Sequence, residues 1–524
     1  MIGFAHPCHR GALIGVIGSG CIFGGCFMTT EQAPPQSFGR QLWRKKSINR
    51  MLSGGGHAGP ELKRTIGTFQ LTMFGVGATV GTGIFFVLQE AVPDAGPAVI
   101  LSFILAGVAA GLSALCYAEM ASAIPVSGST YSYAYAALGE LVAMVVAACV
   151  LLEYGVSTAA VAVGWSGYLN KLLENLFGAG IPDALSYAPI PHEGNTVGFI
   201  NLPAVLLVFM CALLLIRGAS ESAKVNATMV VIKLAVLLMF VVIGLTAFNA
   251  DNFENFMGAG VAGIGAAAGT IFFSFIGLDA VATAGEEVKN PQKTMPRAIL
   301  LALFIVTAVY VAVAVAGVGA QPASEFEAEE QQSAGLAVIL DNITGSTWAG
   351  TVLALGAVIS IFSVTLVTLY GQTRILFAMG RDGMISKRFA AVNPRTLTPT
   401  FNTWVVAIVV ALIAGFVPSG YLWDVISIGT LGAFTVVAIG VMVLRRTEPD
   451  MPRGFKVPLY PVTPILTVVV CLWVVYNLPV QTWVYFLIWL VIVISFYLLY
   501  GRRHSALNNP DQPLPDLPDT MKGH

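Results

Sequence analysis

The sequence predicts an all-α polytopic membrane protein, and three of its features support this fold class. Of the 524 residues, 56% are hydrophobic and only 10% are charged, whereas an ordinary soluble domain is about 25% charged. The mean hydropathy is +0.79. Apolar runs long enough to cross a bilayer, about 20 residues each, recur along the chain. The net charge of −1 and the lack of a basic stretch interleaved with aromatics give no indication of nucleic-acid binding.

The chain divides into a polar N-terminal segment, a long apolar region and a short polar tail. We expect residues 1–64 to be a cytoplasmic segment, residues 65–503 a transmembrane domain, and residues 504–524 a cytoplasmic tail. Residues 11–27 are weakly apolar and glycine-rich, and are too short for a good spanning helix. Residues 1–27 are therefore either a signal-like segment or not part of the true product, with Met28 as the start.

A window of about 20 residues predicts twelve membrane spans. They lie near residues 68–88, 97–122, 138–163, 197–216, 226–248, 261–285, 296–319, 348–378, 403–418, 422–444, 461–478 and 482–500. If the N-terminus is cytoplasmic, Lys171 is the only basic residue of the outer loops. The basic residues on the inner side are then Arg217, Lys224, Lys289, Lys293, Arg297, Arg374, Arg381, Lys387, Arg388, Arg395, Arg445, Arg446, Arg453, Lys456, Arg502, Arg503 and Lys522. An odd number of spans would destroy this asymmetry, so both termini are expected in the cytoplasm.

The first span contains a cluster of glycines at Gly75, Gly77, Gly81 and Gly83. Each glycine in a helix interior costs roughly 1 kcal/mol relative to alanine, so the cluster predicts a break. A break inside a membrane is tolerated where the freed backbone faces protein or a polar cavity. Freed N–H groups suit a carboxylate, and freed carbonyls suit an ammonium group or a cation. The stretch is therefore a candidate small-solute site, with a closely packed glycine-rich helix as the alternative.

The sixth span has a second interruption, with Gly277 and Asp279 in its interior. A carboxylate there would cost about 2.5–3.5 kcal/mol if it faced lipid, so it faces a cavity or a partner. Because five crossings separate the two broken spans, the two halves have opposite orientations. This arrangement predicts a leucine-transporter-like fold, with a 5+5 inverted repeat, broken helices 1 and 6, and two peripheral helices. Two unrelated glycine kinks are the alternative.

Several motifs resemble those of a known family. They are GATVGTGIF at 77–85, AGPA at 95–98, YAEM at 117–120, IPVSGSTYSY at 124–133, FFSFIGLD at 272–279, EEVKNP at 286–291, and QTR with AMGRDG at 372–383. Over about residues 42–503, the chain resembles the amino acid–polyamine–organocation superfamily, most closely its cationic amino acid transporter branch. The family's vertebrate members have two further helices, so this chain resembles the bacterial, twelve-helix type.

The resemblance implies a substrate site in the backbone of the two breaks. It places the substrate carboxylate on N–H groups around Gly81, Thr82 and Gly83. It places the ammonium group on carbonyls at Thr79, Val80, Phe273, Ser274 and Ile276. Phe273 is expected to form a gate over the site, although a core or lipid-facing phenylalanine is the commoner role for that residue type. Because backbone groups recognise any α-amino acid, these breaks leave the side-chain preference open.

Two further intramembrane charges are candidate functional groups. Lys233 lies about 10 Å inside the fifth span. The alternative to a functional role is that its side chain extends to the inner membrane surface. In relatives, a lysine here occupies the place of the sodium ion of sodium-coupled cousins. A dehydrated lysine can release a proton near neutral pH, so Lys233 is the candidate proton-coupling group. Glu153, in the third span, is expected to face the substrate or a polar network, or else to be a structural carboxyl.

The function predicted from these features is secondary active import of amino acids across the cell membrane by proton symport and alternating access. An amino acid exchanger, or a transporter of polyamines or other amines, remains open. An enzyme is not expected, because all six histidines lie outside the spans and no HExxH motif is present. The expected partners are an amino acid, a proton and the lipid bilayer; no cofactor or metal is expected.

Overall fold

The computed structural model describes residues 38–48, 51, 62–190, 197–327, 335–476, 478 and 480–508. This part of the chain is helical, and its only extended pairing is an isolated parallel bridge between Ile66 and Val288. The alternatives for residues 1–27 concern residues outside this part of the chain, and so does most of the expected C-terminal tail.

The apolar helices make up most of the described chain. They are α3 (Thr68–Thr79), α4 (Thr82–Ala95), α5 (Val99–Ala123), α7 (Glu140–Phe177), α9 (Leu202–Arg217), α10 (Ala219–Thr246), α11 (Gly260–Phe272), α13 (Pro291–Ala320), α16 (Trp348–Arg381), α17 (Thr400–Phe416), α18 (Ser419–Thr447), α19 (Val462–Tyr476) and α20 (Val480–Phe496).

Short helices connect these elements. They are α1 (Phe38–Leu42), α6 (Ser129–Ala137), α8 (Asp183–Ser186), α12 (Ala280–Thr283), α15 (Leu336–Thr344) and α21 (Arg502–His504). Short 3₁₀ turns are η2 (Gly96–Ala98), η3 (Ala250–Phe253), η4 (Phe273–Phe275), η5 (Gly285–Glu287), η6 (Ala323–Glu327) and η7 (Lys387–Ala390), and η8 (Tyr497–Gly501) is a π-helical turn.

Seven helical stretches of the described chain are long and apolar enough to cross a membrane, and four shorter apolar helices accompany them. A multi-pass membrane protein follows from these stretches. The first predicted span is divided into α3, of 12 residues, and α4, of 14 residues, so neither half has the length of a complete span. The third predicted span, near residues 138–163, belongs to a longer helix, α7, which continues to Phe177.

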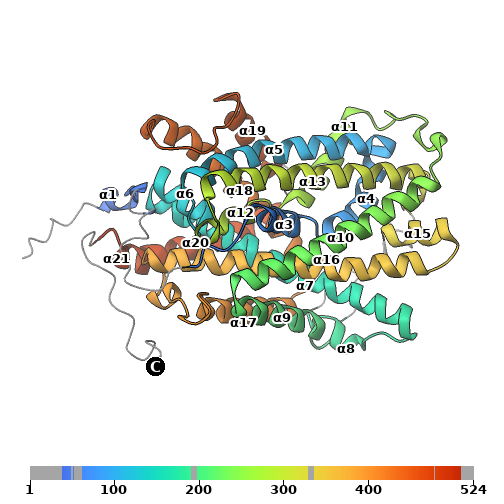
Figure 1. The fold of residues 1–524 in the computed structure, drawn as a ribbon, viewed down its shortest axis with the longest axis horizontal. Coiled ribbons are helices and arrows are strands. Elements are labelled where there is room, and N and C mark those ends of the chain that lie inside the picture. The colour runs from blue at the N-terminus through green and yellow to red at the C-terminus, as the bar shows by residue number, and fades with distance from the viewer. Residues whose placement is uncertain are drawn as a thin grey trace, which may run out of the picture.

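The long helices lie side by side along the longest axis of the molecule (Figure 1). Elements α1, α6 and α21 gather at one end of the bundle, whereas α8 and α15 lie at the opposite end (Figure 1). In the most apolar window of α16, 72% of the residues are buried, against only 17% in that of the last apolar stretch, which includes α20. Helix α16 is therefore central, while α20 has a wide apolar face that a bilayer would cover.

Candidate functional site

The two interrupted helices meet in the centre of the bundle. Helix α3 ends at Thr79 and α4 begins at Thr82, while α11 ends at Phe272 and α12 begins only at Ala280. A Cβ atom added to Gly277 would lie 2.8 Å from the Ala78 carbonyl oxygen. Because only hydrogen occupies that position in glycine, the two breaks can lie in direct contact.

The N-terminal turn of α4 carries backbone N–H groups that have no acceptor within the helix. These groups include those of Thr82 and Gly83, and Gly81 is the N-cap residue without a side chain to bond them. A Cβ atom added to Gly83 would lie 2.7 Å from Ser274 Oγ, so Ser274 lies directly beside this turn. The arrangement can hold an anionic group such as a carboxylate, because the helix dipole adds partial positive charge there.

Lys233 lies on the opposite side of the first break, at the C-terminal end of α3. Its side chain is completely buried, and Nζ donates to the carbonyls of Gly77 at 3.0 Å and Val80 at 2.5 Å. Nζ also lies 3.5 Å from Ser363 Oγ of α16. The amine therefore reaches the break and not the inner membrane surface, and a cation at a helix C-terminus is electrostatically favourable.

Helix α16 adds two hydroxyl groups to this end of α3. Ser360 Oγ donates to the Val80 carbonyl at 3.0 Å, so that carbonyl has two donors. Ser363 Oγ donates to Asn226 Oδ1 at 2.8 Å, and Asn226 Nδ2 donates to the Met73 carbonyl at 3.1 Å. The freed carbonyls near the break are thus bonded by side chains of α10 and α16, as buried backbone groups require.

A residue that the sequence did not single out, Tyr310 of α13, contacts both breaks. Its hydroxyl is 3.0 Å from the Thr79 carbonyl and 3.0 Å from the Ser274 carbonyl, and the residue is fully buried. Its ring packs edge-on against Phe275, with centroids 5.2 Å apart. The sequence could have drawn attention to Tyr310 because it is a tyrosine inside an apolar span, and a buried phenol needs a hydrogen-bond partner.

Glu153 of α7 lies one step further from the breaks. It is only 3% exposed, and its Oε2 has no hydrogen-bond partner within the described part of the chain. The next residue of α7, Tyr154, donates its hydroxyl to Asp279 Oδ2 at 2.5 Å. Asp279 does not make the hydrogen bond that would cap α12.

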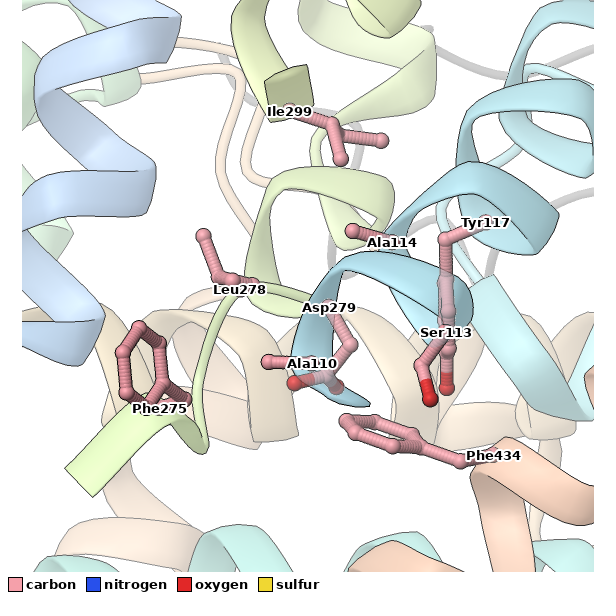
Figure 2. A pocket seen from close by; sticks show the side chains of 9 residues that line it. All are labelled: Ala110, Ser113, Ala114, Tyr117, Phe275, Leu278, Asp279, Ile299 and Phe434. Carbon is pink, nitrogen blue, oxygen red and sulfur yellow. The ribbon is translucent and has the colours of Figure 1, made fainter. Parts of the chain in front are cut away.

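A small cavity lies beside Asp279 (Figure 2). Figure 2 shows Asp279, Ser113 and Tyr117 around it together with apolar side chains such as Phe434. Its volume, measured at the centres of water-sized spheres, is about 10 Å³, which is roughly the room that one water molecule needs. The cavity is therefore too small for an amino acid.

Most residues predicted for the site lie around the two breaks. The backbone of the predicted positions is described at both breaks: Thr79, Val80, Gly81, Thr82, Gly83, Phe273, Ser274 and Ile276. The side chains of Thr82 and Phe273 lie outside the described residues, so the gate expected from Phe273 stays a prediction. Lys233 contacts the first break directly, whereas Glu153 is the neighbour in sequence of Tyr154, which bonds Asp279 of the second break.

Comparisons with known proteins give a family match and several relatives. A family model described as amino acid permease matches residues 66–499. The methylthioribose transporter of Bacillus subtilis is 42% identical over 469 residues, which cover 89% of this chain and 99% of that protein. The branched-chain amino acid permease BcaP of the same species is 41% identical over 467 residues, which also cover 89% of this chain and 99% of that protein.

A eukaryotic relative is more distant. The vacuolar cationic amino acid transporter 2 of Arabidopsis thaliana is 36% identical over 433 residues, which cover 80% of this chain and 66% of that protein. The family match extends over both breaks and most of the bundle. The chain therefore belongs to the amino acid permease family, and it is a multi-pass membrane transporter and not an enzyme.

Proposed function

We propose that this protein is a secondary active transporter that imports amino acids across the cell membrane by proton symport. The observation that carries the proposal is the contact between two interrupted helices, with N–H groups on one side of the first break and a buried lysine on the other. We further propose twelve spans in a leucine-transporter-like 5+5 inverted repeat. Residues 1–64 and 504–524 are then cytoplasmic, and residues 65–503 form the transmembrane domain.

In this proposal, the backbone of the breaks binds the part that all α-amino acids share. The carboxylate lies on the N–H groups of Gly81, Thr82 and Gly83, because the start of α4 suits an anion. The ammonium group lies among backbone carbonyls of both breaks, namely those of Thr79, Val80, Phe273, Ser274 and Ile276. Glu153 contributes to the polar surroundings of the site, and Phe273 closes it.

Lys233 is the proton-coupling group of the proposed mechanism. Three acceptor atoms surround Nζ, those of Gly77, Val80 and Ser363, and a protonated amine has three N–H donors to match them. Loss of the proton leaves two donors for three acceptors and removes the positive charge from the end of α3. The first break then loses part of the hydrogen bonding that Lys233 gives to its carbonyls. This loss couples proton release to movement of α3 relative to the rest of the bundle.

The relatives differ in the substrates that their names give. Branched-chain and cationic amino acids appear in the names of two of them, and methylthioribose, a sugar without ammonium or carboxylate, in that of a third. A sugar transporter is therefore a second candidate function, favoured by the 42% identity to that relative. The amino acid is preferred here because the start of α4 offers N–H groups and partial positive charge that suit a carboxylate.

Uptake into proteoliposomes tests these proposals together. Labelled leucine, isoleucine, alanine, arginine and methylthioribose would be supplied with and without an inward proton gradient. Gradient-dependent accumulation of an amino acid is the expected result. Uptake that ignores the gradient and requires internal amino acid would instead identify an exchanger, and uptake of methylthioribose alone would identify the sugar transporter.

Two lysine variants test the coupling group. Lys233→Ala is expected to lose gradient-driven accumulation, whereas Lys224→Ala, which removes an exposed lysine from the same helix, should behave as the wild type. Proton-driven accumulation that survives in Lys233→Ala would show that the coupling group lies elsewhere.

A further inference from the structure

The hydroxyl group of Tyr310 faces two acceptors that belong to different breaks. Its oxygen is 3.0 Å from the Thr79 carbonyl and 3.0 Å from the Ser274 carbonyl. The ring is held between Phe275 and Phe103, with centroids 5.2 Å and 6.2 Å away. The hydroxyl is therefore fixed in place by its ring and lies between the two chain segments.

A phenol hydroxyl has only one hydrogen to donate. At any moment Tyr310 can therefore bond well to one of the two carbonyls, and the other lacks that hydrogen. The neighbouring carbonyls differ in this respect: Val80 accepts from both Lys233 and Ser360, and Gly77 accepts from Lys233. Among the side-chain donors to these four carbonyls, only Tyr310 divides one hydrogen between two of them.

We propose that Tyr310 is a positioning residue that occupies one of the Thr79 and Ser274 carbonyls and so confines the substrate ammonium to the other. This inference rests on the proposed amino acid transport. In the empty transporter the single hydrogen is shared between the two breaks and holds them together. When the ammonium arrives and donates to one carbonyl, Tyr310 donates to the other, so both buried acceptors are satisfied only in the loaded transporter.

Tyr310→Phe removes this hydrogen and keeps the ring between Phe103 and Phe275. In the empty variant both carbonyls then lack the hydrogen that Tyr310 supplies. An ammonium group has three hydrogens and can bond to both of them, so leucine supplies two missing hydrogen bonds to the variant and one to the wild type. Leucine should bind about two- to tenfold more tightly to the variant, the equivalent of one net hydrogen bond.

The same counting gives a different result for 2-hydroxy-4-methylpentanoate, the hydroxy acid analogue of leucine. Its hydroxyl has one hydrogen and satisfies one carbonyl in either protein. Its affinity should therefore be the same for Tyr310→Phe and the wild type. Maximal transport of leucine by the variant should fall by a similar two- to tenfold, because tighter ground-state binding without a matching gain in the transition state slows the step.

The experiment measures binding and uptake of labelled leucine, and competition by the hydroxy acid, for the wild type, Tyr310→Phe and Tyr497→Phe. Tyr497→Phe is the matched control, since it removes a buried hydroxyl that bonds Glu140 at 3.1 Å and not the breaks. If Tyr310→Phe does not survive purification, KM and maximal rate in membrane vesicles give the same comparison.

Tighter binding of leucine without a change for the hydroxy acid supports the inference. Weaker binding of both compounds, or an equal change in both, overturns it, because a merely structural tyrosine would affect the two alike. If the wild type binds the hydroxy acid but no amino acid, the proposed function fails and the inference fails with it. Normal amino acid binding by the wild type with weakened binding by the variant overturns only the role of Tyr310.

Discussion

Replacement of Gly277 by alanine should separate the two breaks. Gly277 has φ of +106°, outside the range that L-residues adopt readily, and its added Cβ would lie 2.8 Å from the Ala78 carbonyl oxygen and 3.0 Å from the carbonyl carbon. The backbone conformation costs about 1–3 kcal/mol for a residue with a side chain. Overpacking adds about 1–3 kcal/mol, because a helix carbonyl cannot turn aside as a flexible side chain can.

Together these costs lower the free energy of unfolding by roughly 2–6 kcal/mol, a large part of the stability of an ordinary domain. Denaturant titration in detergent micelles would measure this change, and uptake in proteoliposomes would show the loss of transport. The matched control is Gly265→Ala in α11, where an added Cβ would meet nothing within 4 Å. A Gly277→Ala protein that unfolds within about 0.5 kcal/mol of the wild type and transports normally would refute the described contact.

Two further predictions concern the ion pairs that Glu287 and Glu286 make with arginines of α16. Arg374→Ala should lower the free energy of unfolding by about 3–5 kcal/mol, because the variant leaves the Glu287 carboxylate buried without its partner at 2.9 Å. The control variant Arg395→Ala, at an exposed site, should change the free energy of unfolding little. Equal losses of stability in the two variants would contradict the reasoning. Glu286 lies outside the predicted membrane spans. Burial raises the pKa of its carboxyl group, but Arg381 outweighs this and holds the pKa below its ordinary value of 4.5. The resulting stability is complete above pH 4.5 and is lost as the pH falls through the lower folded-state pKa. Thermal unfolding should therefore show that Glu286→Gln is less stable than the wild type at pH 7, and this difference in stability should shrink below about pH 4.5. A difference in stability that stays constant from pH 7 to below pH 4.5 would exclude the ion pair as its source.

The sequence alone was sufficient for the fold class and for the position of the first break. Apolar runs of spanning length and the low charge content act locally, so they can be read without knowledge of tertiary contacts. The glycines at 75, 77, 81 and 83 lower helix stability at the place where α3 ends and α4 begins. Gly277 and Asp279 indicated the second interruption for a similar reason.

The sequence was less informative about helix length and about partners. The end of α7 was not predicted, because an apolar window detects the part of a helix that suits lipid, while its polar last turns follow helix propensity. Lys233 had two readings in the sequence, and only the packing of α10 against α3 decided that its amine lies on the carbonyls of the break.

Tyr310 is the residue that only the tertiary structure could single out. In the sequence it is one aromatic residue within an apolar span, and such residues are mostly core or lipid-facing. Its role depends on two carbonyls, those of Thr79 and Ser274, that lie 231 and 36 positions away along the chain. Local propensity determines where the helices break, but which side chain satisfies the freed backbone depends on which helices pack together, and that is a property of the assembled bundle.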